Sequence, residues 1–333
     1  MALPAKLRRR LMIGVLFGML VYVGMAVLLD VRGVTEAIMR LPLWVLPTAC
    51  ALSFANYVCR FWKWQRYLKL LEIRMATRTS WLIYLSGFSM SVTPGKLGEV
   101  FKSWLIRKIN RTAIHQSAPI IVAERFTDLL AYLILVALGG IASLPEYQWV
   151  FWATLGLCGL GLVLAGSERF SRLMAGLFRR LPYLWRLAPR IEGSFASTRI
   201  LLAPGEIVMP TLVSVVGWGF ECTGFWLIAN AMAAGDVSYL TAVFAYAFSA
   251  VAGAVLIVFP GGLGITEGSM GAILRRTYYS GDVKALIEGA RQAAAAAVIL
   301  ARLCTLWFAV GIGLIAMARF SRLYGGVDEN EPS

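Results

Sequence analysis

Charged side chains follow directly after two interrupted apolar stretches of this sequence. In TPGKLGEVFKSWLIRK (93–108), Lys96, Glu99 and Lys102 are spaced by three, which puts them roughly on one face of a helix. The Pro-Gly-x-Leu-Gly pattern recurs in FPGGLGITEGSMGAILRR (259–276). Pro and Gly would end one helix, and the next would begin with unpaired N–H groups that attract anions. Two such helix starts facing each other would form a polar pocket inside a bilayer.

More charged residues lie within apolar segments. The string ERFTD contains Glu124, Arg125 and Asp128. Glu221 and Arg302 lie in later apolar segments. A charge near the bilayer centre costs about 3 kcal/mol on insertion scales, so it needs a partner or a function. We therefore expect a substrate-binding site formed by Lys96, Glu99, Glu124, Arg125, Asp128, Glu221, Glu267 and Arg302. The hairpin tips beside it would be Pro94, Gly95, Gly98, Pro260, Gly261 and Gly264.

Purely structural roles stay open for these charges. Arg125 could pair with Glu99, and Arg302 with Glu267, and such pairs would hold the interrupted helices without touching substrate. Glu221 would be either protonated and hydrogen-bonded or paired with Arg302. The protonated alternative would suit proton coupling.

Two other basic residues have membrane-surface interpretations. Lys102 could extend to the inner membrane surface. Arg60 and Asn56 lie at the inner end of an apolar stretch, before more Arg, Lys and Trp residues. That composition is typical of a cytoplasmic interface, so we expect Arg60 to anchor at lipid headgroups.

The composition indicates an integral membrane protein. The chain is 59% hydrophobic and 15% charged, whereas soluble domains are about 25% charged. The net charge of +14 comes from Lys and Arg beside apolar runs, where they orient spans and meet anionic lipid. No polar block is large enough for a nucleic-acid-binding domain, so that function is excluded.

We expect no metal, cofactor or nucleophilic site. Metal sites need clusters of ligands, and the chain has one histidine, His115. The cysteines all lie singly in apolar segments: Cys50, Cys59, Cys158, Cys222 and Cys304.

Apolar runs predict full transmembrane spans at Leu11–Leu29, Leu43–Cys59, Ser117–Leu144, Trp149–Gly166, Ile207–Ala233 and Val283–Ala316. Between them lie two predicted re-entrant hairpins: Trp81–Val92 with Leu97–Ile106, and Tyr239–Phe259 with Ile265–Leu274. The basic flanks place both chain ends in the cytoplasm. If Tyr239–Phe259 crossed the membrane instead, the basic C-terminal flank would lie outside.

Residues 168–200 predict an amphipathic segment on the inner leaflet. Phe170, Met174 and Phe178 form part of an apolar stripe, with arginines largely off it. A helix that caps the bundle is the alternative.

The two halves of the chain repeat one series of elements: span, span, hairpin, charged span. Residues 1–144 would form the first repeat and 145–322 the second, followed by a flexible tail at 323–333, all in one membrane domain. The halves start on opposite sides, so the repeat is inverted, as in many transporters. The predicted class is an all-α polytopic membrane protein with six spans and two hairpins.

These motifs resemble a known family. The strings PGKLGE, ERFTD and FPGGLGITE are similar to those of the lysylphosphatidylglycerol synthase transmembrane family, also described as flippase-like membrane proteins. The resemblance covers nearly the whole chain and implies movement of a lipid between leaflets. Fused members carry a soluble aminoacyl-transfer domain after the membrane part. The chain ends at Ser333, so we expect a stand-alone member without that activity.

We therefore expect a non-enzymatic translocase for a lipid with a charged headgroup, in the bacterial cytoplasmic membrane. Lys96, Arg125, Arg302 and the hairpin starts would bind phosphate, and the acidic residues would balance charge, hold the hairpins or bind a cationic headgroup. Its partners would be anionic or aminoacylated phospholipids, polyprenyl phosphates or glycolipids. The alternatives are an enzyme that modifies a lipid headgroup, a non-transporting scaffold, and a small-solute transporter.

Overall fold

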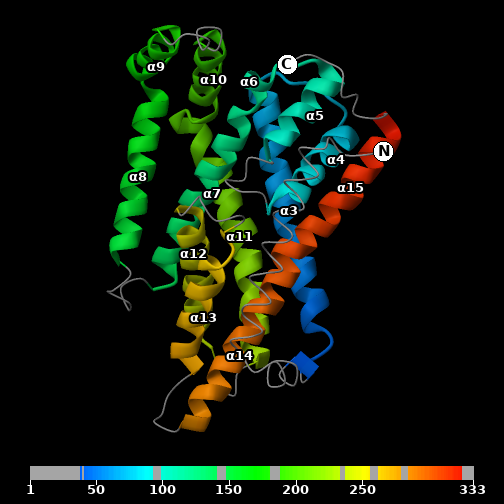
Figure 1. Ribbon diagram of the computed structural model, residues 1–333, viewed down its shortest axis with the longest axis vertical. Coiled ribbons are helices and arrows are strands. Elements are labelled where there is room, and N and C mark those ends of the chain that lie inside the picture. The colour runs from blue at the N-terminus through cyan, green and yellow to red at the C-terminus, as the bar shows by residue number, and fades with distance from the viewer. Residues whose placement is uncertain are drawn as a thin grey trace.

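The computed structural model describes residues 38–39, 41–92, 99–140, 148–180, 188–232, 237–255, 262–278 and 284–324. Throughout these ranges the regular structure is helical, with no strand, which confirms the predicted all-α class. Figure 1 shows the helices forming an elongated bundle.

The centre of the bundle is built from three long helices and one shorter one. Helix α3 (Val45–Leu70) packs along α11 (Pro204–Met232), and α7 (Pro119–Leu138) packs on α11 and on α12 (Tyr239–Val255). Helices α7 and α11 each begin with a proline, whose fixed φ suits the first turn of a helix.

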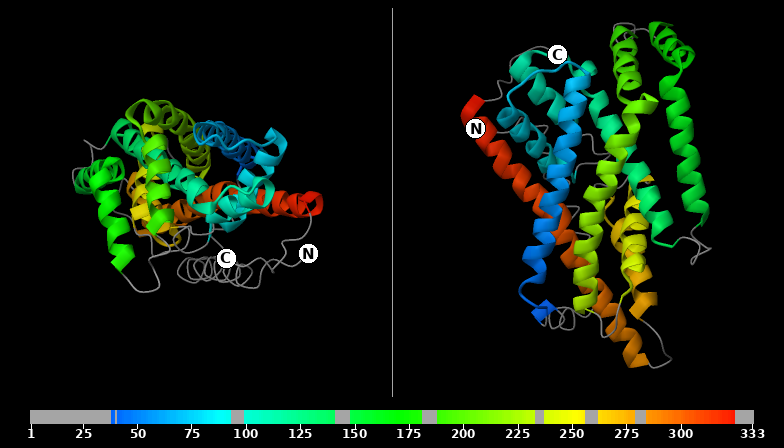
Figure 2. Two further views of the ribbon diagram at one scale, coloured as in Figure 1. Left: turned by 90° about the horizontal axis from the view of Figure 1, so that it is seen from above. Right: turned by 180° about the vertical axis from the view of Figure 1, so that it is seen from behind.

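Two helical pairs lie in opposite halves of the long axis (Figures 1 and 2). Helix α4 (Thr77–Gly87), continued by the 3-10 turn η1 (Phe88–Met90), packs on α5 (Val100–Asn110). Helix α12 packs on α13 (Ile265–Tyr278) in the same manner. These pairs occupy the positions of the predicted hairpins.

The C-terminal segment is a long helix interrupted by one π-helical turn. Helix α14 (Lys284–Arg302) leads into η7 (Leu303–Trp307) and then into α15 (Phe308–Tyr324). Helix α14 packs on α13 and α11, while α15 packs on α4 and η1. One continuous element therefore contacts both helical pairs.

An outer layer covers α7 on one side (Figures 1 and 2). It consists of α8 (Gln148–Gly166), α9 (Glu168–Arg180) and α10 (Ala188–Leu201), and α10 also packs on the short helix α6 (Ile114–Ser117). The predicted amphipathic segment is thus two helices.

Helix α9 has features of both predicted roles, an amphipathic helix on the membrane surface and a helix that caps the bundle. It turns away from α8 by 75° and packs against α10. Ser171 and Ala175 are buried, whereas Leu173 and Leu177 are exposed. Contact with α10 is what the capping alternative requires, and the exposed leucines leave an apolar strip for a membrane surface.

Within the described residues, two helices are long and apolar enough to cross a membrane. They are α11 and the segment Gly289–Tyr324, with a third if α8 and α9 count as one bent span. The predicted number of six spans and the inverted repeat stay predictions, as does the division at residue 144. The predicted span Leu11–Leu29 lies outside the described residues.

The structure moves several predicted boundaries. Helix α3 continues eleven residues past the predicted span end at Cys59, to Leu70. The stretch expected at a membrane interface is therefore helical, and Lys63 and Trp64 within it are fully buried. Helix α15 reaches Tyr324, two residues into the predicted tail.

A close helix contact tests the packing of α15. Gly313 lies against the backbone of Ser89, so a methyl group there would overlap that backbone. We expect Gly313→Ala to destabilise the protein by about 1–3 kcal/mol, which lowers the melting temperature by several degrees. Gly311→Ala is the matched control, because nothing lies within 4 Å of a methyl group at that position. Equal melting temperatures in detergent for the two variants would contradict this packing.

Candidate functional site

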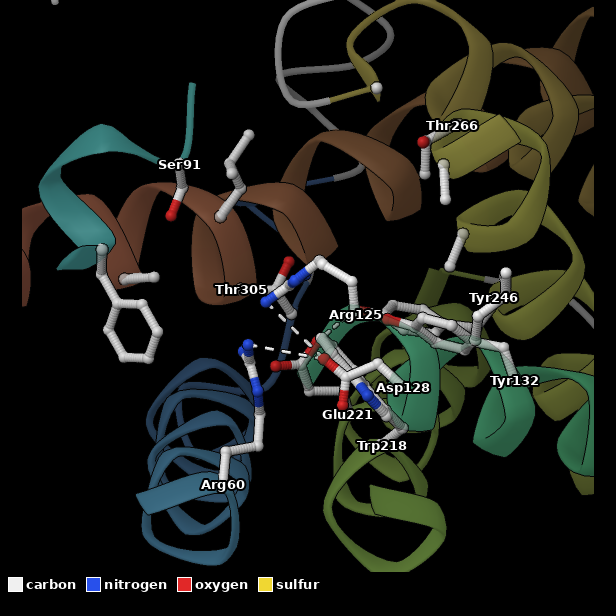
Figure 3. A pocket seen from close by; sticks show the side chains of 18 of the residues that line it. Arg60, Ser91, Arg125, Asp128, Tyr132, Trp218, Glu221, Tyr246, Thr266 and Thr305 are labelled. Carbon is white, nitrogen blue, oxygen red and sulfur yellow. Dashed lines mark hydrogen bonds and ion pairs between the residues drawn. The ribbon is translucent and has the colours of Figure 1, made fainter. Parts of the chain in front are cut away.

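A cavity of about 370 Å³ lies among α3, η1, α7, α11, α12 and the C-terminal helix. Its charged lining residues are Arg60, Glu99, Arg125, Asp128, Glu221 and Arg302. Figure 3 shows Arg60, Arg125, Asp128 and Glu221 directed toward one space. Aromatic side chains complete much of the wall: Tyr57, Phe88, Tyr132, Trp218 and Tyr246.

Asp128 on α7 is the centre of the charged cluster. Lys63 on α3 donates to its Oδ1 at 2.6 Å, and Ser214 on α11 donates to the same oxygen at 2.9 Å. Lys63 also donates to Ser214 at 2.7 Å and to Thr127 at 3.2 Å. One carboxylate thus joins three helices, and Lys63 lies behind the cavity wall with no exposed surface.

Glu124 and Lys102 form a second buried pair. Lys102 Nζ donates to Glu124 Oε2 at 2.5 Å and lies 4.6 Å from the ring centroid of Trp64. The methylene groups of Lys102 pack on Gly87, which has no side chain to block them. The suggestion that Lys102 reaches the membrane surface is therefore wrong. This ion pair joins α5 to α7. Neither Lys102 nor Glu124 lines the cavity.

The two ion pairs considered from sequence are both present. Arg125 Nε lies 3.3 Å from Glu99 Oε2, and its Nη2 lies 3.6 Å from Asp128. Arg302 Nε donates to Glu267 Oε1 at 2.6 Å.

Glu267 also caps the start of α13. Its other carboxylate oxygen accepts the N–H of Gly264 at 2.6 Å, and Gly264 has a φ of +90° that favours glycine. The predicted anion site at this helix start is occupied, at that N–H, by a side chain of the protein itself. Arg302 lines the cavity and Glu267 does not.

Glu221 on α11 is held by neutral side chains. Asn56 on α3 donates to Oε1 at 2.6 Å, and the hydroxyl of Tyr246 on α12 donates to Oε2. Gly217 makes room for this contact, because a methyl group there would lie 2.6 Å from Asn56 Oδ1. Of the two environments expected for Glu221, the structure has the hydrogen-bonded one rather than the pair with Arg302.

Arg60 is a cavity residue rather than a membrane anchor. Its guanidinium carbon lies 5.1 Å from the ring centroid of Trp218 and 5.6 Å from that of Phe88, distances typical of cation–π contacts. Its Nη2 lies 3.6 Å from Asp128 Oδ2. The predicted headgroup anchor at the membrane surface is therefore wrong, since Arg60 is buried.

The structure brings most predicted site residues together. Glu99, Arg125, Asp128, Glu221 and Arg302 line the cavity. Glu124 and Glu267 lie behind them, each bonded to a basic partner. Lys96 and the tip residues Pro94, Gly95, Gly98, Pro260 and Gly261 lie outside the described residues.

The sequence-based prediction of the site did not include several side chains that the structure places there. The spacing of three of them could have indicated their common position. Asn56, Arg60 and Lys63 follow each other at i, i+4 and i+7 in an otherwise apolar stretch, which marks one helix face. Ser214, Trp218 and Tyr246 carry no comparable signal, because such residues are common throughout apolar helices.

Among the described residues, no group of three or more His, Cys, Asp or Glu side chains is placed to hold a metal ion. The side chains that face the cavity are instead suited to electrostatic binding and hydrogen bonding of a polar group within an apolar bundle.

The long apolar helices that surround this charged cavity point to a multi-pass membrane protein. The family described as Lysylphosphatidylglycerol synthase TM region matches residues 12–313, so the chain belongs to this family. The family name associates the protein with membrane lipid metabolism. No curated protein matches the chain.

The buried pair of Lys102 and Glu124 gives a stability prediction. Lys102→Met leaves a buried carboxylate without its cation, so we expect a loss of about 3–5 kcal/mol. The double variant Lys102→Met/Glu124→Leu removes both charges and should recover much of that loss. Thermal melts of the purified variants measure both effects.

The control for this prediction is Arg66, which pairs with Glu206 in a partly exposed position. We expect Arg66→Met to cost less than about 1 kcal/mol. A double variant less stable than Lys102→Met would contradict the assigned pairing.

Proposed function

We propose that the protein moves a lipid with an anionic headgroup between the leaflets of a bacterial cytoplasmic membrane, without modifying it. The observation that carries this proposal is the set of three arginines, Arg60, Arg125 and Arg302, on the wall of one cavity inside an apolar bundle. Guanidinium groups bind phosphate oxygens through paired, charge-assisted hydrogen bonds.

The setting of the arginines supports a lipid over a small solute. Apolar and aromatic side chains interleave with them around the cavity, among them Phe88, Leu129 and Leu306. A phosphate could bind to the arginines while acyl chains stay in the surrounding apolar environment. The membership of a family named for lipid synthesis agrees with this chemistry.

The arrangement of the helical pairs supports movement rather than static binding. Arg125 with Glu99 and Arg302 with Glu267 each join a long helix to the start of a shorter one, α5 or α13. An inverted repeat built around such broken segments would allow the cavity to open to each side in turn. An incoming phosphate that competes for the arginines would loosen these contacts.

The carboxylates in the cavity would set the charge that the site accepts. Glu99 and Asp128 lie close to arginines, so they reduce the positive charge that a ligand meets. A headgroup with a single negative charge suits such a partly neutralised site. Aminoacylated lipids would use the same arginines for phosphate and the carboxylates for the amine.

Lipid binding and movement by Arg125 variants test the proposal. We expect native mass spectrometry of the purified protein to show enrichment of one anionic lipid class. Arg125→Ala should weaken that enrichment about tenfold or more, since it removes a charged hydrogen-bond donor. The same variant should slow the movement of a fluorescent analogue of that lipid between leaflets of proteoliposomes. For Arg125→Lys, we expect lipid enrichment and the rate of lipid movement to lie between those of wild type and Arg125→Ala.

Arg66→Ala is the matched control, because Arg66 lies outside the cavity and pairs with Glu206. Melting temperatures separate binding defects from misfolding. Enrichment and movement unchanged in a folded Arg125→Ala variant would rule out this site. A chemically altered lipid recovered from wild type would favour an enzyme instead.

A further inference from the structure

Among the described residues that line the cavity, Arg60 shares its nearest carboxylate with other cations, and Glu221 forms its hydrogen bonds with neutral side chains. Each of the other buried charges in the described part of the chain has a close opposite charge: Lys63 and Asp128, Lys102 and Glu124, Arg125 and Glu99, and Arg302 and Glu267. Arg60 lies 3.6 Å from Asp128, but that carboxylate already accepts Lys63 at 2.6 Å. Glu221 is bonded to Asn56 and Tyr246, which are both neutral.

These two charges face the same cavity. Asn56, which donates to Glu221, and Arg60 are four residues apart on α3, so they lie on one face about one helical turn apart. Figure 3 shows Arg60 and Glu221 directed toward the same space. The positive charge of Arg60 and the negative charge of an ionised Glu221 therefore offset each other within this cavity.

An anion that enters beside Arg60 changes this balance. With Glu221 ionised, the bound anion would add a second negative charge in a water-poor environment, where unbalanced charge is costly. With Glu221 protonated, the site would carry one net positive charge, and a monoanion would neutralise it.

We propose that the cavity takes up one proton together with one anionic lipid headgroup, with Glu221 holding the proton and Arg60 pairing with the phosphate. This inference rests on the proposed function and adds its energy source. The carboxylate of Glu221 takes H⁺ from water and becomes a carboxyl, and the phosphodiester keeps its negative charge. On release at the other face the proton returns to water, and no covalent bond to the lipid changes.

The partners of Glu221 suit both of its states. The Tyr246 hydroxyl donates to a carboxylate, and it can also accept a hydrogen bond from a carboxyl. Asn56 Oδ1 is buried without a hydrogen-bond partner among the described residues. A half-turn of the Asn56 amide would aim this acceptor at a protonated Glu221. The unpaired acceptor of Asn56 is therefore available to receive a hydrogen bond from a protonated Glu221.

The other titratable groups near Glu221 come from four neighbouring elements and from its own. They are Tyr57 and Arg60 on α3, Arg125, Asp128 and Tyr132 on α7, Tyr246 on α12, Arg302 on α14, and Cys222 on α11. Among them Asp128, Arg125 and Arg302 have opposite charges close by. Glu221 is therefore the group whose protonation responds most directly to an anion at Arg60.

The test measures lipid binding and proton uptake by the same purified protein. The probe is short-chain phosphatidylglycerol, which is monoanionic, with phosphatidylcholine as the neutral comparison. If a proton enters with the lipid, wild-type affinity falls as the pH rises, by up to about tenfold per unit for one linked proton. Addition of the lipid to weakly buffered protein should take up one proton for each lipid bound.

Variants isolate the two roles. Glu221→Gln keeps the shape of the side chain but cannot titrate, so its affinity should vary less than about twofold between pH 5 and pH 8, without proton uptake. Glu206→Gln, at the far end of α11 and outside the cavity, should behave like wild type. Arg60→Gln should weaken lipid binding about tenfold or more at every pH. Melting temperatures verify that each variant is folded.

The outcomes separate this inference from the proposed function. Lipid binding without proton uptake, or uptake that persists in Glu221→Gln, would overturn the proton role and leave lipid movement standing. Equal binding of dimethyl phosphate, which has the charge without acyl chains, would overturn the assignment to a lipid headgroup. If wild type binds no anionic lipid at any pH, the proposed function and this inference fail together.

Discussion

The rest of the site depends on the contact between Lys63 and Asp128, two charges held away from water. Neither could remain charged in an apolar interior alone, because an unpaired buried ion costs several kcal/mol. Their hydrogen bond at 2.6 Å, together with the bonds that each of them makes to Ser214, fixes α3, α7 and α11 relative to one another. The positions of α3 and α7 then determine where Arg60 and Arg125 lie, and these two side chains form part of the cavity wall.

The charged residues fall into two groups, those buried behind the cavity wall and those that form part of it. Pairs behind the wall, such as Lys102 with Glu124, satisfy each other and hold the shorter helices in place. Charges on the cavity wall, such as Arg60 and Arg125, also face a space that a ligand could enter. The same low dielectric that makes the inner pairs obligatory also makes the outer charges sensitive to any ligand charge.

Part of this architecture could be predicted from sequence. The all-α class follows from long apolar runs, and the pairs Arg125–Glu99 and Arg302–Glu267 follow from the high cost of buried charge. The role of Arg60 could not be predicted by the rule used, because basic residues after an apolar run usually mark a membrane interface. Here the helix continues to Leu70, and Arg60 and Lys63 lie on its buried face. The position of Lys102 on α5 depends on the absence of a side chain at Gly87 on α4, a tertiary contact between two helices that no pattern within either helix encodes.

The π-helical turn at Leu303–Trp307 sets the rotation of α15 relative to α14 about their common helix axis. A π-turn holds one residue more than an α-turn, which shifts everything beyond it by about 100° around the axis. Arg302 can therefore face Glu267 while the α15 face bearing Gly313 meets η1. The turn also leaves the carbonyl of Thr305 available to the hydroxyl of Tyr57 at 3.0 Å. The π-helical turn thus orients α14 toward α13 and α15 toward α4. A one-residue deletion in this turn would rotate α15 about its axis relative to α14, so the two could no longer make both contacts.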